Sequence, residues 1–143
     1  MKAETVHIHD YPDRDALAIA LAAGIAAKLA GAIAERGEAS LAVSGGSTPK
    51  RLFGILAGTE IAWDRVTVIL VDERICAPGS DRANQKLVRE TLLQDKAAAA
   101  HFVPFETGLA TPEENAERSA DLFAGVPWPL DAAVLGMGTD GHT

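Results

Sequence analysis

Short apolar segments alternate with segments of helical periodicity along the chain, and this alternation limits the possible folds more than any other feature. Residues 40–43 and 66–71 are apolar runs of the length of buried strands. The other expected strands are residues 6–9, 102–103 and 130–135. Short apolar strands separated by helices are typical of an open, mostly parallel sheet. We therefore expect residues 1–143 to form a single α/β domain, a Rossmann-like three-layer fold with helices on both faces of the sheet.

The first helix follows the first expected strand. Its apolar face consists of residues that recur every four positions: Leu17, Leu21, Ile25, Leu29 and Ile33. Asp10 is the expected N-cap, Pro12 lies in the first turn, and Gly37 ends the helix. Lys28 interrupts the apolar stretch and many of its residues are alanine, so we expect a helix of a soluble core rather than a membrane span.

The second and fourth helices have recognisable ends. Thr48 is expected to cap the second helix, with Pro49 as its first residue and Gly58 as its end. The fourth helix begins at Thr111-Pro112-Glu113-Glu114, where Thr and Glu form a capping box, and ends near Gly125. The third helix carries an apolar face made of Leu87, Val88 and Leu92.

The chain ends directly after the last expected strand and its loop. In a doubly wound fold another helix normally covers such a strand, and without it an apolar face or a sheet edge is left bare. We therefore expect the domain to be incomplete at its C-terminus, so that residues 1–143 are the N-terminal part of a longer domain.

Three loops of unusual composition directly follow expected strands: residues 44–48, 72–74 and 136–142. In open parallel sheets, ligands bind in a crevice outside the carboxyl ends of the strands. All three loops can therefore face one crevice, and we expect the functional site there.

The loop Ser44-Gly45-Gly46-Ser47-Thr48 has the composition of a phosphate cradle. Adjacent glycines permit positive φ and the close approach of main-chain amides to a ligand. The helix that follows directs free NH groups and a partial positive charge at the same point. The spacing is not that of a Walker A loop. From this loop alone, a simple strand-to-helix turn with a Ser/Thr cap is an equally good interpretation.

The second loop, Asp72-Glu73-Arg74, places a cation at a strand end. Arg74 can serve a phosphate group or the negative charge that develops on a carbonyl oxygen. A surface ion pair between Arg74 and one of the two acids is the more common explanation for such a triplet.

The third loop contains His142 and matches the dinucleotide fingerprint Gly-x-Gly-x-x-Gly at Gly136, Gly138 and Gly141. That match is weak, because the chain supplies no later acidic residue for the motif. A histidine in a glycine-rich loop is poorly placed for core packing and well suited to proton transfer near neutral pH. Asp140 can orient this histidine or bind a sugar hydroxyl.

Charge and cysteine content exclude some classes of function. The net charge of −7 argues against nucleic-acid binding and against an anionic membrane surface, so a phosphate site must be built locally. Cys76 is the only cysteine, which suits a reducing, cytoplasmic location. His7 and His9 could form a metal pair on the first expected strand. No third ligand is evident, so we expect no metal site.

Together, the three loops, extended by Pro49 and Thr143, resemble the 6-phosphogluconolactonase family in content and order. The resemblance covers the whole chain and the larger, N-terminal part of that family's domain. It implies hydrolysis of 6-phosphoglucono-δ-lactone to 6-phosphogluconate in the oxidative pentose phosphate pathway, without a cofactor. One minor departure is Ala83, which stands before Asn84 where the family often has Ser.

The resemblance also implies roles for individual residues. His142 would take a proton from the attacking water and then protonate the departing ring oxygen, with Asp140 as a further catalytic residue. Arg74 would contact the oxyanion or the phosphate, and residues 44–48 would hold the phosphate. The remaining substrate-binding residues would be Asp72, Gly138 and Gly141.

Two other functions are compatible with the pattern. Glucosamine-6-phosphate deaminases share the sheet, the glycine-rich loop and an Asp-Gly-His loop, and Asp72 could serve as their carboxylate base; they have an aromatic residue where Arg74 stands. A non-catalytic sugar-phosphate sensor is the second alternative. Such sensors usually carry a DNA-binding module, and no helix-turn-helix or basic patch precedes the first expected strand here.

Overall fold

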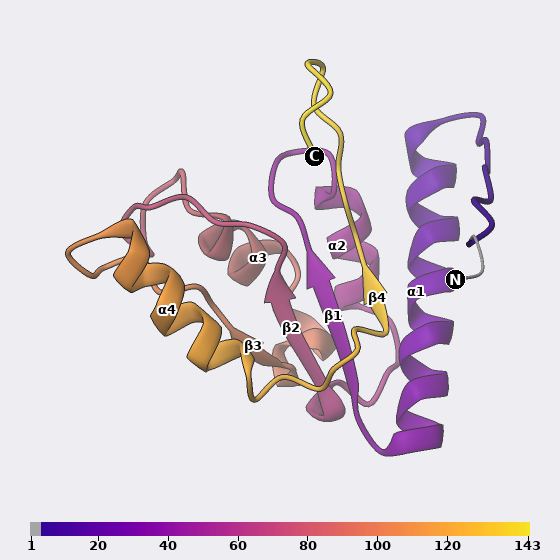
Figure 1. Ribbon diagram of the computed structural model, residues 1–143. Helices are drawn as coiled ribbons and strands as arrows, with labels where there is room; N and C mark the ends of the chain where they lie inside the picture. Colours follow the sequence, from indigo (N-terminus) through magenta and orange to yellow (C-terminus); the bar gives the residue numbers. More distant parts are fainter. Residues whose placement is uncertain (1–3) are drawn as a thin grey trace.

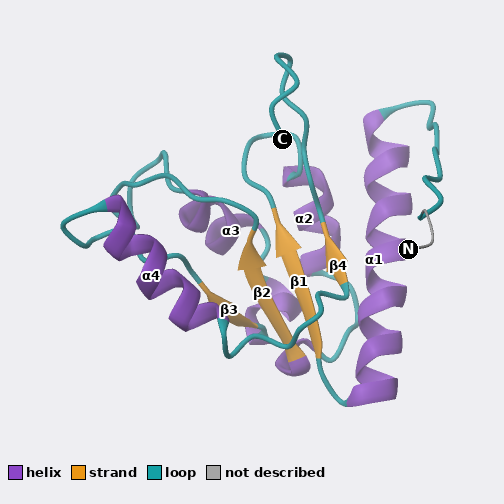
Figure 2. Cartoon of the chain, in the orientation of Figure 1, coloured by secondary structure: helices purple, strands orange, loops and turns teal. Residues whose placement is uncertain are grey.

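The computed structural model describes residues 4–143 and shows a parallel sheet between two layers of helices (Figures 1 and 2). The strands in this part of the chain are β1 (Ala39–Val43), β2 (Val66–Leu70), β3 (His101–Val103) and β4 (Ala132–Ala133). Their order in the sheet is β3-β2-β1-β4, and every pair is parallel. The register places Leu41 of β1 between Val68 of β2 and Ala132 of β4. This confirms the expected α/β class.

The helices cover the two faces of the sheet unequally. They are α1 (Arg14–Arg36), α2 (Lys50–Ala57), α3 (Asn84–Thr91) and α4 (Pro112–Phe123), with short 3-10 helices at Trp63–Arg65 and Asp95–Ala99. Side chains of α1, α2 and α3 share the larger core with β1 and β2. On the opposite face, Phe123 of α4 packs on a small cluster formed by Ala42, Ile69 and Val126.

The direction in which the chain winds reverses next to β1. From β1 the chain passes through α2 to β2 and then through α3 to β3, moving outward along one side of the sheet. It then returns through α4 on the other face and enters β4, which pairs with the free side of β1 (Figure 1). Such a switch point leaves a crevice between the carboxyl ends of the two strands. The loops after β1 and β4 therefore begin at this crevice.

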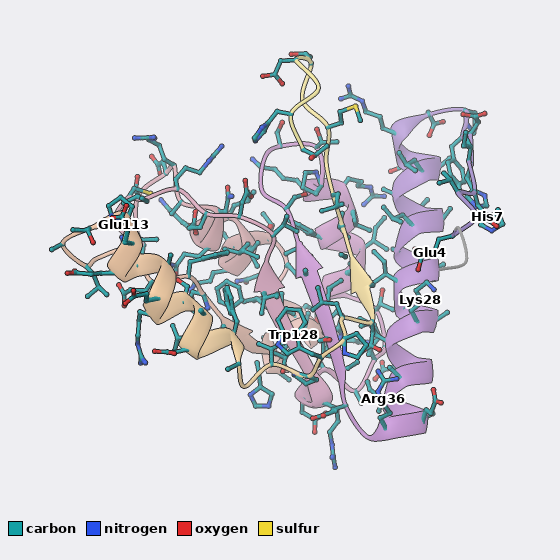
Figure 3. All side chains as sticks on the ribbon, viewed as in Figure 1. Glu4, His7, Lys28, Arg36, Glu113 and Trp128 are labelled. Carbon is teal, nitrogen blue, oxygen red and sulfur yellow. The ribbon has the colours of Figure 1, made fainter. Side chains whose placement is uncertain are left out.

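Asp131 fixes the start of β4 against β1 and α1. Its Oδ2 accepts a hydrogen bond from the main-chain NH of Ser40 at 2.8 Å, and its Oδ1 pairs with the guanidinium of Arg36, labelled in Figure 3. The Ser40 hydroxyl is fully buried and donates to the carbonyl of Pro127 at 2.7 Å. These contacts satisfy the buried polar groups at the base of the β1–β4 pair.

The expected strand at residues 6–9 is wrong. These residues lie outside the sheet, and the side chains of Val6 and Ile8 are 84% and 83% exposed. The helix that follows begins at Arg14, and its N-cap is Asp13 rather than Asp10. Asp13 has an extended backbone, and its Oδ1 accepts from the NH of Ala16 at 2.7 Å. A strand needs a hydrogen-bonded neighbour, and none lies beside this segment within residues 4–143.

The buried face of α1 differs from the expected row of residues. Ile25 and Leu29 are buried, whereas Leu17 and Leu21 are 43% and 39% exposed. Each four-residue step rotates about 40° around a helix, so a row of five such residues drifts off the face that meets the sheet. Alanines take the buried positions instead: Ala18, Ala22 and Ala32.

Helix α1 is more apolar than we expected when its alanines and Lys28 were taken to be too polar for a membrane span. A window of this helix reaches a mean hydropathy of 2.0, which satisfies the length and composition of a membrane span. In the structure the helix contributes Ile25 and Leu29 to the larger core and packs against α2 and β1. Core helices pass the same test of length and composition, so this finding is weak evidence for a membrane span.

Several other element ends were predicted correctly, and two were not. Gly37 ends α1 in the left-handed conformation, and Thr111 Oγ1 accepts from the NH of Glu114 at 3.2 Å at the start of α4. Helix α2 begins one residue late, at Lys50, and Thr48 makes no capping bond because Pro49 occupies the N-cap position. Strand β4 is shorter than residues 130–135, since it pairs only with Leu41 and Ala42.

Candidate active site

The three loops predicted to converge line one cleft of about 780 Å³ at the carboxyl ends of β1, β2 and β4. Ser44–Thr48 follows β1, Asp72 and Arg74 follow β2, and Gly136, Gly138 and His142 follow β4. Leu17 and Leu21 of α1, which the periodicity had placed in the core, form part of the wall. The switch point of the sheet is therefore where residues distant in sequence meet.

The loop Ser44–Thr48 has the backbone of an anion-binding turn. Gly46 has φ of +91°, a conformation that L side chains rarely adopt. Within residues 4–143, no hydrogen bond uses the main-chain NH groups of Gly45, Gly46, Ser47 or Thr48. The first turn of α2 follows immediately, and its free NH groups carry a partial positive charge. The loop thus offers several unused donors at the mouth of the cleft.

Positive side chains gather around this cleft although the chain as a whole is acidic. Arg14, Lys50, Arg51 and Arg74 line it, whereas Asp72 is the one acid among the described lining residues. The Arg51 Nε lies 2.6 Å from Asp15 Oδ1, which ties the first turn of α2 to that of α1. Arg14, Lys50 and Arg51 were not among the site residues predicted from the sequence. Two basic residues in the first turn of a helix are electrostatically unfavourable there and were an available signal.

Arg74 is not held by the acids beside it in sequence. Its Nη1 donates to the carbonyl of Arg82 at 2.9 Å and to Asn84 Oδ1 at 3.3 Å. Among the residues the structure describes, no carboxylate lies within ion-pair distance of this guanidinium. The interpretation of Asp72-Glu73-Arg74 as a surface ion pair is therefore wrong, and the Arg74 cation is free to face a ligand.

Glu73 instead caps the start of α3. Its Oε1 accepts from the main-chain NH of Asn84 at 2.6 Å and of Arg74 at 2.8 Å, and its Oε2 accepts from the NH of Gln85 at 2.8 Å. The N-cap position itself is Ala83, whose methyl side chain cannot accept a hydrogen bond. A carboxylate eleven residues upstream thus satisfies the first two amides of the helix. Local capping rules could not reveal this partner.

Asn84, the first residue of α3, is a buried part of the cleft that the sequence analysis did not assign. Its side chain is 4% exposed. Nδ2 donates to the main-chain oxygen of Asp72 at 3.1 Å and to Asp72 Oδ1 at 3.3 Å. The Asn84 amide also lies directly against Gly45.

The loop after β4 folds back on itself around Asp140. Gly141 has φ of +83°, and the NH of Gly138 donates to the carbonyl of His142 at 2.6 Å. Asp140 Oδ1 accepts from the main-chain NH of His142 at 3.0 Å. In the described part of the chain, Asp140 makes no hydrogen bond to the imidazole of His142. Its carboxylate therefore stabilises the loop backbone and does not orient the imidazole ring. His142 is exposed and borders the cleft together with Gly138.

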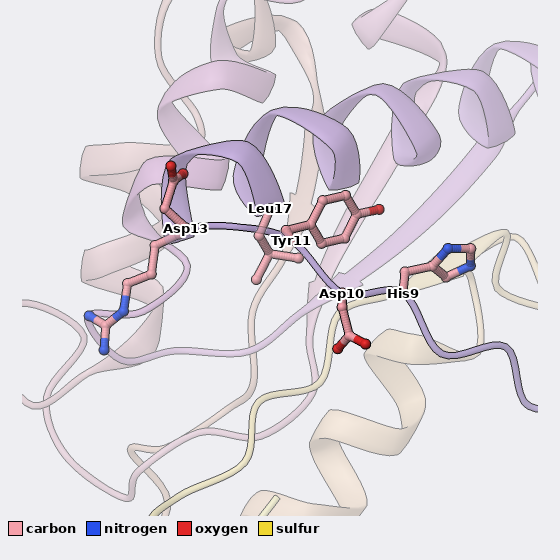
Figure 4. A pocket seen from close by; sticks show the side chains of 6 residues that line it. His9, Asp10, Tyr11, Asp13 and Leu17 are labelled. Carbon is pink, nitrogen blue, oxygen red and sulfur yellow. The ribbon is translucent and has the colours of Figure 1, made fainter.

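A second, smaller pocket of about 360 Å³ adjoins the cleft and shares Arg14 and Leu17 with it. Figure 4 shows the side chains of His9, Asp10 and Tyr11 around it. Because residues 6–9 form no strand, His7 and His9 do not share a strand face. No group of three or more metal-ligating side chains occurs in residues 4–143.

Residues 12–143 match the family described as glucosamine-6-phosphate isomerases/6-phosphogluconolactonase. The 6-phosphogluconolactonase of Rhizobium meliloti (strain 1021) is 51% identical over 139 residues, which cover 97% of this chain and 60% of that protein. The 6-phosphogluconolactonase of Mesorhizobium japonicum is also 51% identical, over 93% of this chain and 56% of its own.

The fold agrees with solved structures of similar proteins. The crystal structure of a 6-phosphogluconolactonase from Shewanella baltica OS155 superposes with a TM-score of 0.90 at 43% identity. The superposition covers 92% of this chain and 57% of that one. The chain therefore spans about 60% of the length of the proteins that it matches.

Proposed function

Because the chain belongs to the family of glucosamine-6-phosphate isomerases and 6-phosphogluconolactonases, we propose that its protein hydrolyses 6-phosphoglucono-δ-lactone to 6-phosphogluconate. Two relatives with 51% identity carry the name 6-phosphogluconolactonase. The observation that carries the proposal is geometric: the anion-binding turn, Arg74 and His142 all border one cleft. A cleft of about 780 Å³ lies within the range of small-molecule sites.

In this proposal the phosphate of the substrate binds to Ser44–Thr48. The support is the set of unused main-chain NH groups in this loop and the positive end of α2. Lys50 and Arg14 line the same cleft and add positive charge. A phosphate fixed at one end of a sugar ring also fixes the lactone carbonyl at the other end, which lowers the entropy cost of reaching the transition state.

His142 is the proposed general base. Its imidazole would take a proton from a water molecule while the water oxygen attacks the lactone carbonyl carbon. The tetrahedral intermediate then collapses, the bond to the ring oxygen breaks, and the imidazolium returns the proton to that oxygen. The support is the place of His142 at the cleft, on a turn shaped by Asp140 and Gly141.

Arg74 is the proposed electrostatic group, for the oxyanion or for the phosphate. Its guanidinium has no ion-pair partner in the described chain, so its charge is available to a ligand. Asp72, Gly138 and Gly141 are proposed to contact the rest of the sugar, because Asp72 and Gly138 line the cleft and Gly141 shapes the loop. This chemistry needs no cofactor and suits the cytoplasm.

The test is a direct assay with two substrates on the protein as its gene encodes it. Hydrolysis of freshly prepared 6-phosphoglucono-δ-lactone is followed as acid release, with the spontaneous rate subtracted. Release of ammonia from glucosamine 6-phosphate is measured in parallel, because the family includes that chemistry. Lactone hydrolysis well above the spontaneous rate supports the proposal. Ammonia release without it would replace the proposal by the deaminase function.

A further inference from the structure

Asn84 connects two of the loops that form the cleft. Its side chain is buried, yet both of its polar atoms have partners, as expected for a buried amide. Nδ2 donates to the main-chain oxygen and to the carboxylate of Asp72, and Oδ1 accepts from Arg74 Nη1. The loop after β2 is therefore pinned to the first residue of α3 through both ends of one amide.

The same amide packs against the loop after β1. A Cβ atom built on Gly45 would overlap the Asn84 side chain, with the Nδ2 atom at 2.9 Å and Oδ1 and Cγ closer still. Asn84 cannot turn aside without losing its bonds to Asp72 and Arg74. Gly45 is thus required because the Asn84 amide occupies the space that a side chain would need.

The two adjacent glycines of this loop are needed for different physical reasons. Gly46 has φ of +91° and open space beside it, so a side chain there would meet backbone strain but no neighbour. Gly45 is not among the residues with positive φ, so a side chain there would meet Asn84 without backbone strain. This difference lets the contact between Gly45 and Asn84 be tested separately from the shape of the turn.

We propose that Asn84 is a positioning residue that holds the loop Ser44–Thr48 and the Arg74 guanidinium at a fixed separation. One sugar phosphate can then reach the amides of the first loop and the cation of the second together. Asn84 acts through Gly45 and Arg74, and it touches no reacting atom. The inference deepens the proposed function and rests on it for its activity readout.

The experiment is a double-mutant cycle between Gly45→Ala and Asn84→Ala in the protein as its gene encodes it. We measure kcat/KM for the lactone, the affinity for inorganic phosphate by calorimetry, and Tm. Gly45→Ala should lower kcat/KM and phosphate affinity by about ten-fold in the native background and by less than about two-fold in the Asn84→Ala background. Gly46→Ala is the matched control. It should lower kcat/KM and phosphate affinity by the same factor in both backgrounds.

Two results would overturn the inference. Equal losses from Gly45→Ala in both backgrounds would mean that the ligand, not Asn84, needs the space at Gly45. If Asn84→Ala alone lowers Tm but leaves kcat/KM and phosphate affinity unchanged, its role is only structural. Should the double variant not fold, Asn84→Ser frees similar space and the cycle is run with it. If the native protein does not hydrolyse the lactone, the proposed function fails. The phosphate affinities of the four proteins in the cycle still test whether Gly45 and Asn84 are coupled.

Discussion

The carboxylate of Glu73 accepts a hydrogen bond from the main-chain NH of Asn84 at 2.6 Å, so one acid next to Arg74 anchors the start of α3. The same carboxylate also receives the NH of Gln85. The residues of the triplet Asp72-Glu73-Arg74, which follows β2, thus have different roles. Glu73 holds the helix in place, while Asp72 and Arg74 remain at the cleft.

This division predicts a stability effect at Glu73. Glu73→Ala leaves the first amides of α3 without a partner, and the free energy of unfolding should fall by about 1–2 kcal/mol. Urea unfolding followed by circular dichroism measures the change. Glu117→Gln, on the exposed face of α4, is the matched control and should alter stability by less than about 0.5 kcal/mol. An unchanged midpoint for Glu73→Ala would contradict the capping role.

Replacement of His142 should remove turnover and keep ligand binding. His142→Ala deletes the proposed base, and kcat should fall by about 10²–10⁴-fold. The affinity for 6-phosphogluconate should change little, because the proposed phosphate contacts lie on another loop. Stopped-flow acid release and calorimetry measure the two quantities. His7→Ala, an exposed residue outside the cleft, should retain full activity. Full turnover by His142→Ala would assign the base elsewhere.

Removal of the Arg74 charge should slow the reaction and reveal which group it serves. Arg74→Gln keeps a hydrogen-bonding side chain without the cation, and kcat/KM should fall by about 10²–10³-fold, as when one transition-state donor is removed. A loss confined to kcat assigns Arg74 to the oxyanion, whereas a rise in KM assigns it to the phosphate. Arg82→Gln is the control, because that residue uses only its main-chain carbonyl in this network. Undiminished kcat/KM would remove Arg74 from the mechanism.

A β-branched residue at Gly46 should weaken phosphate binding. The left-handed backbone at this position costs a branched L residue about 1–2 kcal/mol or more, and the turn would relax away from its native shape. We expect Gly46→Val to raise KM strongly with a smaller change in kcat. Gly54→Ala is the control, since a Cβ there meets nothing within 4 Å and its φ is not positive. A KM equal to that of the native protein would place the phosphate at another site.

Much of the site was predictable because parallel strands share a direction. Once residues 44–48, 72–74 and 136–142 were recognised as loops after strands, their meeting at one edge of the sheet followed from topology. The side-chain partners were not predictable in this way. Arg74 bonds to Arg82 and Asn84 rather than to the acids beside it, and Asp140 bonds to the main chain of His142 rather than to its ring.

The hydrophobic pattern of the sequence also gave wrong predictions where the structure of a segment depends on a neighbouring element. Residues 6–9 have strand-like composition, but a strand forms only with a hydrogen-bonded partner, and none is adjacent among the residues that the structure describes. Leu17 and Leu21 follow the helical period, yet they face the cleft because α1 meets the sheet with another side. Periodicity identifies an apolar face but does not say which neighbour will cover it.

From residue 14 onward, the sequence by itself determined the order of strands and helices, the parallel α/β class and the loops that line the cleft, because these depend on local periodicity and on glycine, proline and capping residues. Only the tertiary structure decided that Asn84 fills the space beside Gly45 and that Glu73 caps α3. Contacts of this kind join residues far apart in the chain. Their energies depend on the relative placement of whole elements, which no short segment of sequence contains.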